Sequence, residues 1–306
     1  MNSDIREIRQ EGPYCYTYSP FHKPLAVVQA GETVCIHTVD AFENKMTPEV
    51  KAFADVCTYP FLNPQTGPIL VEGAEPGDTL VVKILSIVPT RDHAVTGLVP
   101  YFGGLTSTKP DPTLQDPLEE QWLFLPIDDD GVRFDDKRTI PYEPFMGTMG
   151  VAPKIEAVNA LTPDYYGDNM DCVETCPGNE VWFPVQVDGA HFFTGDAHAS
   201  QGDGELTGVA LEIPAKVTVT FELKKGYTIQ WPRILSDSFL MVAGSGRPLD
   251  AAARIAWVEL IDWLAADYGF DRLKAYHLLG QVGQMRLGNM VDPKFTMVAK
   301  FPRQYL

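Results

Sequence analysis

The sequence predicts a mainly β fold of the α+β class, a β-rich sandwich or distorted barrel with a C-terminal helical segment. Short runs rich in β-branched residues recur up to about residue 250 and are separated by Pro/Gly turns, which is typical of sandwiches and barrels. Helical signals occur at 251–268 and 273–279, near the C-terminus. The length of 306 residues suits one domain, 1–306, with possible substructure as an N-terminal β-rich part, 1–160, and a C-terminal part, 161–306.

The N-terminal half supplies the first series of predicted strands. Apolar runs are expected to form strands at 24–28, 33–39, 69–73, 79–88 and 122–126. Turn-forming residues separate them at 30–32, 63–68 and 76–78, and the three aspartates at 128–130 are interpreted as a solvated hairpin turn, not as a metal site. Residues 109–120 are rich in proline and acids and are expected to form an exposed excursion.

The strand predicted at 33–39 ends at a carboxylate. Asp40 closes this run, at a position from which an acidic side chain can face a cleft. His37 lies three residues earlier, so on a strand it points to the opposite face. We therefore interpret His37 as a structural residue.

Two glycine-containing segments precede the centre of the chain. Residues 144–153, PFMGTMGVAP, are apolar with small residues interspersed, a composition that core packing explains. Residues 167–171, GDNMD, are predicted to form a glycine-led turn that carries the carboxylates of Asp168 and Asp171.

The densest chemistry lies at residues 195–205, between an apolar run at 185–187 and a β-like run at 208–212. The segment contains three glycines and is predicted to be a loop that brings backbone close to a bound group. Its acids and its imidazole, Asp196, His198, Asp203 and Glu205, are groups that hold a cation or position a water. Asp196 and His198 are two residues apart, so in an extended segment they share a side. Neither an EF-hand loop nor an HExxH motif fits, and a solvated acidic turn is the alternative.

The C-terminal third combines strands with the two helices. Strands are expected at 216–223, 228–233 and 295–301. Asp250 is predicted to be the N-cap of the long helix and Gly269 its C-terminal stop, and the second helix is expected to begin after Asp271. The apolar stripe of the long helix is predicted to consist of Ile255, Val258, Ile261 and Leu264.

Composition excludes several classes of function. A net charge of −17 disfavours nucleic acid and anionic membrane surfaces as partners, because both repel an acidic protein. No segment has the roughly 20 apolar residues of a membrane span, and the N-terminus lacks an apolar signal core. Five cysteines in a long chain argue against a disulfide scaffold, so we expect a cytoplasmic protein. Cys172 and Cys176 are spaced CxxxC, unlike a zinc knuckle or a redox pair.

The segment GDAHASQGDGELTGVALE at 195–212 resembles the signature of the acetamidase/formamidase family. Matching segments follow the family order: NPQTGPILVEGAEPGDTL at 63–80, PFMGTMGVAP at 144–153, GDNMD at 167–171 and DAAARIA at 250–256. The resemblance covers nearly the whole chain and implies an acetamidase/formamidase-like β-rich fold. It also implies an amidohydrolase that cleaves short aliphatic primary amides, small neutral molecules, to carboxylate and ammonia. Family members are oligomers, so a homo-oligomer is expected.

The resemblance also directs the choice of site residues. Asp40, Asp171, Asp196 and His198 are the candidate ligands of a divalent metal, with zinc the first choice because of the imidazole and calcium the second because carboxylates dominate. Where the family motif has a second glycine, this chain has Asp168, which leaves open which of Asp168 and Asp171 contacts the metal; we favour Asp171. Glu205 is the candidate base, with His198 as the other catalytic residue, and a role for Glu205 as a ligand stays open. Phe145, Met146 and Gly195 are candidates for substrate binding.

Two other functions compete with a metal-dependent amidase. The chain could use Cys172 as a nucleophile with Glu205 as base, which would make it a metal-free amidase. It could also be a β-rich binding protein that holds a cation without catalysis. The amide that it prefers, the identity and number of metals, and the number of subunits do not follow from the sequence.

Overall fold

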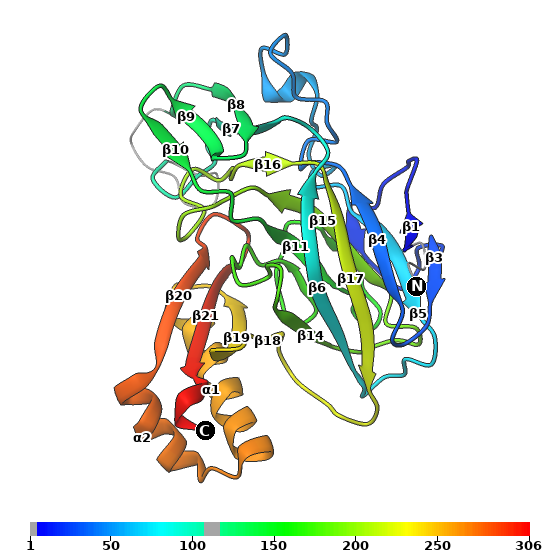
Figure 1. Ribbon diagram of the computed structural model, residues 1–306, viewed down its shortest axis with the longest axis vertical. Coiled ribbons are helices and arrows are strands. Elements are labelled where there is room, and N and C mark those ends of the chain that lie inside the picture. Colours follow the sequence, from blue (N-terminus) through cyan, green and yellow to red (C-terminus); the bar gives the residue numbers. More distant parts are fainter. Residues whose placement is uncertain (1–4, 107–116) are drawn as a thin grey trace.

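Two large β-sheets and two α-helices make up the protein, whose computed structural model describes residues 5–106 and 117–306 (Figure 1). The first sheet runs, in spatial order, through β1 (Arg6–Ile8), β4 (Thr33–Thr38), β17 (Ala215–Lys224), β6 (Thr79–Pro89), β14 (Glu180–Pro184), β18 (Arg233–Leu235), β19 (Phe239–Gly246), β21 (Phe295–Pro302) and β20 (Gln284–Asn289). Its longest pairing is the antiparallel one between β17 and β6. β1 and β4 are parallel, whereas the other neighbours in this sheet are antiparallel.

The second sheet contains the segments that carry most of the predicted chemistry. Its main path is β10 (Arg138–Ile140), β9 (Gly131–Asp135), β8 (Gln121–Asp128), β7 (His93–Leu98), β16 (Glu212–Ile213), β15 (Phe192–His198), β11 (Phe145–Val151) and β13 (Gly167–Asn169). β5 (Thr66–Val71) also pairs with β15 and carries β3 (Ala26–Val28) in parallel. A separate two-stranded sheet joins β12 (Val158–Asn159) to β2 (Thr17–Tyr18), and short 3-10 turns occur at η1 (Phe53–Asp55) and η2 (Arg303–Tyr305).

The main hydrophobic core lies between the two sheets. Side chains of the first sheet, such as Ile36, Val82 and Val217, are fully buried in the same cluster as Ile69 and Phe192 of the second. Among the described residues each sheet keeps two end strands, so neither closes into a barrel. The predicted mainly β fold is therefore confirmed in its sandwich form.

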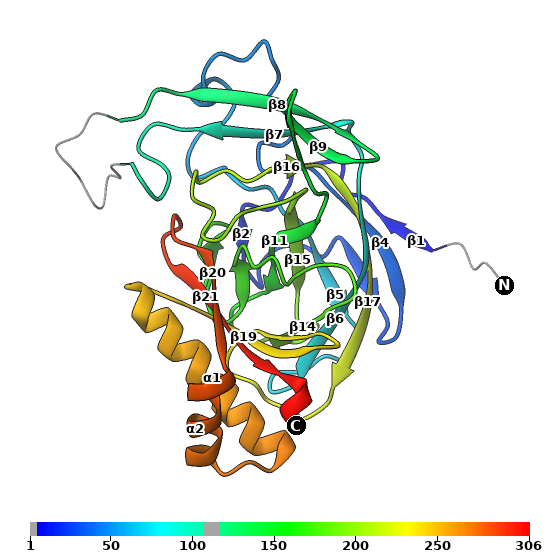
Figure 2. The ribbon, with the colours of Figure 1, turned by 60° about the vertical axis from the view of Figure 1, so that its left-hand side comes forward.

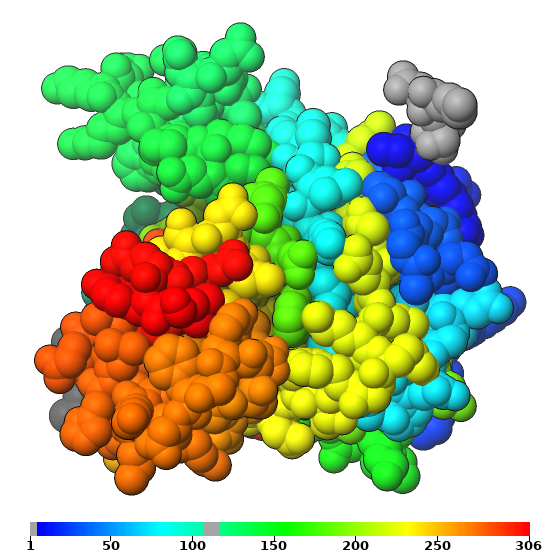
Figure 3. Space-filling view, turned by 60° about the horizontal axis from the view of Figure 1, so that its bottom comes forward, coloured from blue at the N-terminus to red at the C-terminus, as the bar shows by residue number. Residues whose placement is uncertain are grey.

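The helices α1 (Leu249–Tyr268) and α2 (Arg272–Val282) pack on the C-terminal part of the first sheet (Figure 2). β19 alternates its side chains between two layers, because Leu240 and Val242 contact the helical cluster while Met241 and Ala243 lie in the main core. In space-filling view the helices form one lobe, and the hairpin of β8 and β9 protrudes at another corner (Figure 3). No described helix combines the length and the apolar character that crossing a bilayer requires.

Most predicted strands, turns and helices are confirmed. The hairpin turn at 128–130 joins β8 to β9, and Gly269 ends α1 in the left-handed conformation with φ of 69°. Asp271 caps α2 by accepting hydrogen bonds from the amides of Leu273 and Lys274. The excursion predicted at 109–120 lies mostly outside the described residues. At the end of this excursion that the structure describes, the Glu120 carboxylate accepts a hydrogen bond from the indole of Trp122, on β8.

The start and the buried face of α1 differ from the prediction. Pro248, not Asp250, occupies the N-cap, and Asp250 lies in the first turn, where a carboxylate is favourable to the helix dipole. Val258 was expected in the apolar stripe but is 51% exposed, whereas Glu259 is buried. The cause is tertiary: the Arg233 guanidinium donates two hydrogen bonds to the Glu259 carboxylate, at 2.9 and 2.7 Å.

Three predicted segments in the second half also change. The strand expected at 228–233 begins only at Arg233, directly after Pro232, whose nitrogen has no proton to donate to a neighbouring strand. The loop expected at 195–205 is strand β15 up to His198. The run expected at 208–212 forms a strand only at Glu212–Ile213.

Candidate active site

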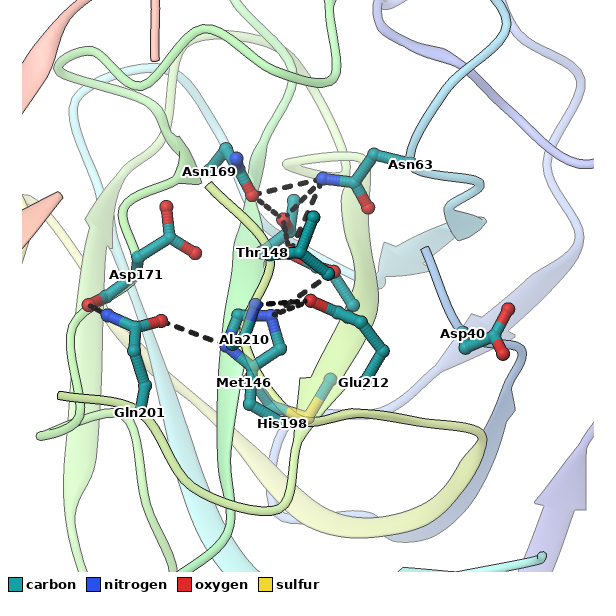
Figure 4. A network of polar contacts seen from close by, with 12 residues as sticks. Asp40, Asn63, Met146, Thr148, Asn169, Asp171, His198, Gln201, Ala210 and Glu212 are labelled. Carbon is teal, nitrogen blue, oxygen red and sulfur yellow. Dashed lines mark hydrogen bonds and ion pairs between the residues drawn. The ribbon is translucent and has the colours of Figure 1, made fainter. Parts of the chain in front are cut away.

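The candidate active site lies where β11, β15 and β16 of the second sheet meet the turn after β13 and the loop between β20 and β21 (Figure 4). Register explains part of it, because His198 on β15 is paired with Glu212 on β16 and with Phe145 on β11. Asp171 is held near β11 by a hydrogen bond from its amide to the Gly147 carbonyl. The parallel bridge between Gly204 and Asn289 fixes the chain just before Glu205.

His198 is at the centre of the site and is fully buried. Its Nε2 lies 3.3 Å from Asp196 Oδ1 and 3.4 Å from Glu212 Oε1, and its Nδ1 lies 3.1 Å from Gln201 Oε1. Gln201 is itself held by hydrogen bonds from its amide nitrogen to the carbonyls of Asp171 and Gly288. The imidazole is therefore fixed in orientation, with one nitrogen directed at two carboxylates.

Two groups of potential metal ligands share this histidine. Asp196, His198 and Glu212 each offer an atom within 4.8 Å of the others, and so do Asp171, His198 and Glu205. All five side chains are buried. The arrangement brings together one imidazole and four carboxylates that the sequence separates by up to 41 residues.

The space for these side chains depends on Gly147. A Cβ atom at this position would lie 2.7 Å from Asp196 Oδ2, 2.7 Å from His198 Cε1 and 2.9 Å from Asp171 Oδ1. These distances are shorter than van der Waals contacts, so any side chain at 147 would displace the three groups. The glycine thus maintains the point at which they converge.

Several acids of the site adopt backbone conformations that are rare outside glycine. Asp168, Asp171, Asp196 and Glu205 have φ angles of 77°, 50°, 58° and 49°. Non-glycine residues in this region cost energy and persist where the surrounding structure holds them, which is common at functional sites. At Asp196 this conformation interrupts the pairing between β15 and β11 opposite Gly147. Asp196 still meets His198, as their two-residue spacing predicts, although the strand between them is irregular.

Burial and charge repulsion dominate the electrostatics. Burial raises the pKa of Asp171 well above its usual range, and the Asp292 carboxylate adds to the effect. Burial and Asp171 act in the same way on the pKa of Glu205, and burial raises the pKa of Glu212 to about 8. Burial alone would lower the pKa of His198, but the carboxylates of Glu212 and Asp196 outweigh it and raise this pKa well above its usual value.

The donor atoms themselves fit a cation. Both carboxylate oxygens of Asp171, Oε2 of Glu212 and Nε2 of His198 are buried without a hydrogen-bond partner among the described residues. Buried polar atoms without partners carry a large desolvation cost, which either bound protons or a cation relieves. Imidazole and carboxylate donors together suit zinc, and the number of carboxylates also suits calcium.

Asp40, one of the four predicted ligands, lies outside both groups. It is fully buried, and its Oδ2 pairs with Arg91 Nη1 at 2.7 Å while its Oδ1 accepts from the amides of Phe42 and Asn44. Figure 4 shows its carboxylate pointing away from His198. Arg91 also donates to the backbone carbonyl of Glu212, so Asp40 is connected to the site through one guanidinium.

Of the three residues predicted to bind substrate, Phe145 and Met146 have fully buried side chains, and Gly195 has only its backbone to offer. The Phe145 ring packs edge-on against the His198 imidazole with 4.9 Å between centroids, and Met146 is fully buried in the main core. Gly195 packs closely against residues 64 and 65. A Cβ atom at this position would lie only 2.5 Å from the Pro64 carbonyl oxygen. Direct contact of these three residues with substrate stays a prediction.

Sequence reasoning missed Glu212 and Asp292. Glu212 had a visible signal, since a carboxylate inside an apolar run is informative when the run is buried. Asp292, whose Oδ2 accepts a hydrogen bond from Asn169 Nδ2 at 2.9 Å, lies in the loop between β20 and β21 and gave no such signal.

A network of buried polar side chains around Asp196 was missed as well. Thr148 Oγ1 donates to Asp196 Oδ2 at 3.0 Å, and Asn63 Nδ2 donates to Thr148 Oγ1 at 2.8 Å and to Asn169 Oδ1 at 3.0 Å. Burial would raise the pKa of Asp196, but the neighbouring His198 charge and hydrogen bonds, including the one from Thr148, lower it. His198 first and the hydrogen bond from Thr148 after it thus favour the ionised form of Asp196.

Cys172 has the surroundings of a core residue. It is fully buried in the main hydrophobic cluster, and burial raises the pKa of its thiol well above the usual value, with Glu174 adding to the effect. A reactive cysteine needs the opposite, an exposed and electropositive environment that favours the thiolate.

A third group of potential ligands, Glu7, Cys35 and His37, lies on β1 and β4. The Glu7 carboxylate already pairs with Arg9 and lies 3.6 Å from Lys216 Nζ. The side chains of Arg9 and Lys216 thus already neutralise the Glu7 carboxylate, the only carboxylate of this group. This agrees with the interpretation of His37 as structural.

A family model described as the acetamidase/formamidase family matches this chain over residues 6–162 and 154–305. Among curated proteins, an acetamidase of Mycolicibacterium smegmatis is 28% identical over 53% of this chain and 53% of its own length. A formamidase of Methylophilus methylotrophus is 27% identical over 68% of this chain and 63% of its own length. The chain thus spans about half to three fifths of the length of these two relatives.

Solved structures match over nearly the whole chain. An acetamidase from Yersinia enterocolitica is 40% identical, with a TM-score of 0.96, over 100% of this chain and 94% of that one. An acetamidase from Bacillus halodurans is 31% identical, with a TM-score of 0.89, over 98% of each chain.

Proposed function

The chain belongs to the acetamidase/formamidase family, and from this premise we propose that it is an amidase that hydrolyses short aliphatic primary amides to carboxylate and ammonia. Family membership supports the class of reaction. The residues around His198 supply groups that this reaction needs: a base for water, charge to stabilise the oxyanion, and a proton for the departing nitrogen.

We propose further that the site works with one or more divalent cations. The supporting observation is the convergence of His198 Nε2, Asp196 Oδ1 and Glu212 Oε1 in a buried site where the imidazole nitrogen has no hydrogen-bond partner among the described residues. Asp171 and Glu205 belong to the adjoining group. Zinc is the first choice because of the imidazole, and calcium is the second.

When bound, such a cation polarises the amide carbonyl and makes a water molecule more acidic. Glu205 is then the residue that accepts the proton of the attacking water and passes it to the amide nitrogen as the C–N bond breaks. Burial and the Asp171 carboxylate raise the pKa of Glu205, so this carboxyl group holds a proton more readily than an exposed glutamate does. Gln201 holds the His198 ring in place through Nδ1.

The direct test measures two quantities on the purified protein, its bound metal and its release of ammonia from acetamide. We expect both to be present, activity to fall after chelation, and zinc to restore it. A metal-free protein with full activity would contradict the cation, and a protein that binds metal but hydrolyses no amide would favour the non-catalytic binding function.

Cys172→Ala separates the thiol mechanism from the one proposed. Because Cys172 is buried in the core with a raised thiol pKa, the variant should keep at least about a tenth of the wild-type kcat, a barrier change within about 1.4 kcal/mol. Loss of several orders of magnitude in a folded variant would instead identify Cys172 as the nucleophile.

A further inference from the structure

We propose that this enzyme prefers primary amides with an unbranched apolar acyl chain longer than acetyl, and that the chain lies in a pocket leading away from Glu205. This inference rests on the proposed amidase function. The pocket is formed between β7–β10 on one side and the segment from Ser200 to Leu211 on the other. Among the described residues, Glu205 is the only acid that lines it.

The volume of the pocket exceeds what acetamide needs. It measures about 430 Å³. A water molecule has a share of about 30 Å³ in the liquid, so the pocket has room for on the order of ten groups of that size. Acetamide has four non-hydrogen atoms. A substrate confined to the polar end would leave most of the pocket to water.

The polar end of the pocket is continuous with the candidate active site. Gln201 and Glu205 both line the pocket. Gln201 is hydrogen-bonded to Nδ1 of His198. Glu205 belongs to the group of potential metal ligands that also contains Asp171 and His198. Gln201 is fixed by three hydrogen bonds in all, so this end is preformed. An amide head group held here would place its acyl chain toward the remaining walls.

The remaining walls are largely hydrocarbon. They include side chains from β8, β9, β10 and the loop after β15, namely Leu123, Phe134, Ile140, Leu206, Val209 and Leu211. Leu123 and Phe134 are each 43% exposed and Leu206 is 47% exposed, although all three are large and apolar. Large apolar side chains gathered at one accessible place mark a ligand site more often than isolated ones do. One polar end and apolar walls match an aliphatic amide.

The first test compares acetamide, butanamide and hexanamide as substrates of the metal-loaded enzyme. Burial of a methylene group favours binding enough to raise kcat/KM about threefold per methylene in a partly open pocket, hence roughly eightyfold from acetamide to hexanamide. A kcat/KM that is flat or falls with chain length would overturn the inference while leaving the amidase proposal intact. If none of the three amides is hydrolysed, the proposed function itself fails.

A set of matched variants tests the location of the chain. Leu123→Gln and Phe134→Gln place a polar group on the walls, so each should lower the ratio of the hexanamide kcat/KM to the acetamide kcat/KM by about fivefold or more. Leu273→Gln changes a side chain on α2 that is 70% exposed and distant from the pocket lining, and it should leave the ratio unchanged. Circular dichroism and a thermal melt confirm that each variant folds.

Sedimentation at the assay concentration tests whether the pocket walls bind the acyl chain of a substrate or form an interface with a second copy of the protein. If the pocket walls were an interface between copies, Leu123→Gln would lower the sedimentation mass and leave the ratio of kcat/KM values unchanged. That result would overturn the inference. A lowered ratio at constant mass would support it.

Discussion

At the scale of residues, the site is defined by groups held in unfavourable states that the fold maintains. Asp171, Asp196 and Glu205 have left-handed backbone conformations, and their carboxylates are buried next to His198. Each condition has a cost, and neither arises from local preference. A site of this kind should respond strongly to small changes in side chains.

Glu205→Gln tests the role of the candidate base. The amide keeps the shape of the carboxylate but cannot accept the water proton, so kcat should fall roughly a hundredfold or more while bound metal is retained. Ammonia release and metal analysis on the same sample provide the measurement. His198→Ala is the contrasting variant and should lower both bound metal and activity.

Other outcomes for these variants have clear meanings. If Glu205→Gln empties the site of metal, Glu205 is a ligand and the base lies elsewhere. A fully active Glu205→Gln enzyme, or wild-type kinetics in both variants, would end the proposal and restore the interpretation of 195–205 as a solvated turn.

Gly147→Ala tests the space at which the ligands converge. The added Cβ would come within 3 Å of Asp171, Asp196 and His198, so bound metal and ammonia release should both be lost. Overpacking of this kind costs about 1–3 kcal/mol, and a thermal melt should show a folded but less stable protein. Gly280→Ala, on α2 with open space around it, is the control and should keep metal and activity. Wild-type metal content in Gly147→Ala would show that the ligands converge elsewhere.

At the scale of elements, turns are stabilised by specific acids, and Asp78 is the best example. This residue follows the turn before β6, and its carboxylate accepts hydrogen bonds from the amides of Glu75 and Gly226, at 2.8 and 2.7 Å, and from Lys225 Nζ at 2.6 Å. Burial acts to raise its pKa, but the Lys225 charge and the hydrogen bonds outweigh this and lower the pKa below its usual value. Asp78 thereby joins the turn that precedes β6 to the turn that follows β17, at one end of this antiparallel pair.

Asp78→Asn should destabilise the protein by about 2 kcal/mol at pH 7, because charge-assisted hydrogen bonds are weakened. The sign of the pH dependence follows from the lowered pKa. The contribution of Asp78 is complete above its unfolded-state pKa near 4 and is lost as pH falls through the folded-state pKa. Urea unfolding of both proteins should therefore show a gap that narrows below about pH 4.

A control separates this effect from the loss of a surface charge. Asp129→Asn removes a charge in the exposed β8–β9 turn and should change the free energy of unfolding by less than about 0.5 kcal/mol. If the Asp78→Asn gap stays constant from pH 7 to pH 3, ionisation of Asp78 does not stabilise the fold.

At the scale of the whole molecule, both tryptophans of α1 pack against other parts of the same chain. Trp263 is fully buried against Trp182, and Trp257 packs beside Gly283 at the end of α2. Apolar side chains are exposed elsewhere, for example Leu85 and Val88 on β6, which are 52% and 51% exposed. β6 lies inside the first sheet, so these side chains point away from the sandwich core.

We therefore expect the protein to be a homo-oligomer that uses a sheet surface and not α1. Sedimentation equilibrium should give a multiple of the 33.9 kDa chain mass, and Leu85→Glu with Val88→Glu should reduce that mass. A mass of one chain for the wild type would refute the oligomer. If the double variant has the same mass as the wild type, the interface does not involve Leu85 and Val88 of β6.

The sequence by itself determined the features that depend on neighbouring residues. Apolar runs located β6, β17 and β21, turn residues located the hairpin at 128–130, and Asp271 with Gly269 marked helix ends. Two-residue spacing on a strand also put Asp196 and His198 on one side, where the structure has them 3.3 Å apart.

Tertiary structure alone decided which distant groups meet. Glu212 faces His198 because β16 pairs with β15, and Asp292 reaches Asn169 from a loop more than 100 residues later in the chain. Asp40 pairs with Arg91, which no local pattern indicates. Glu259 occupies the buried face of α1 because Arg233 neutralises it there. Such contacts depend on strand pairing and burial across the whole chain, whereas periodicity and capping report only a few neighbouring residues.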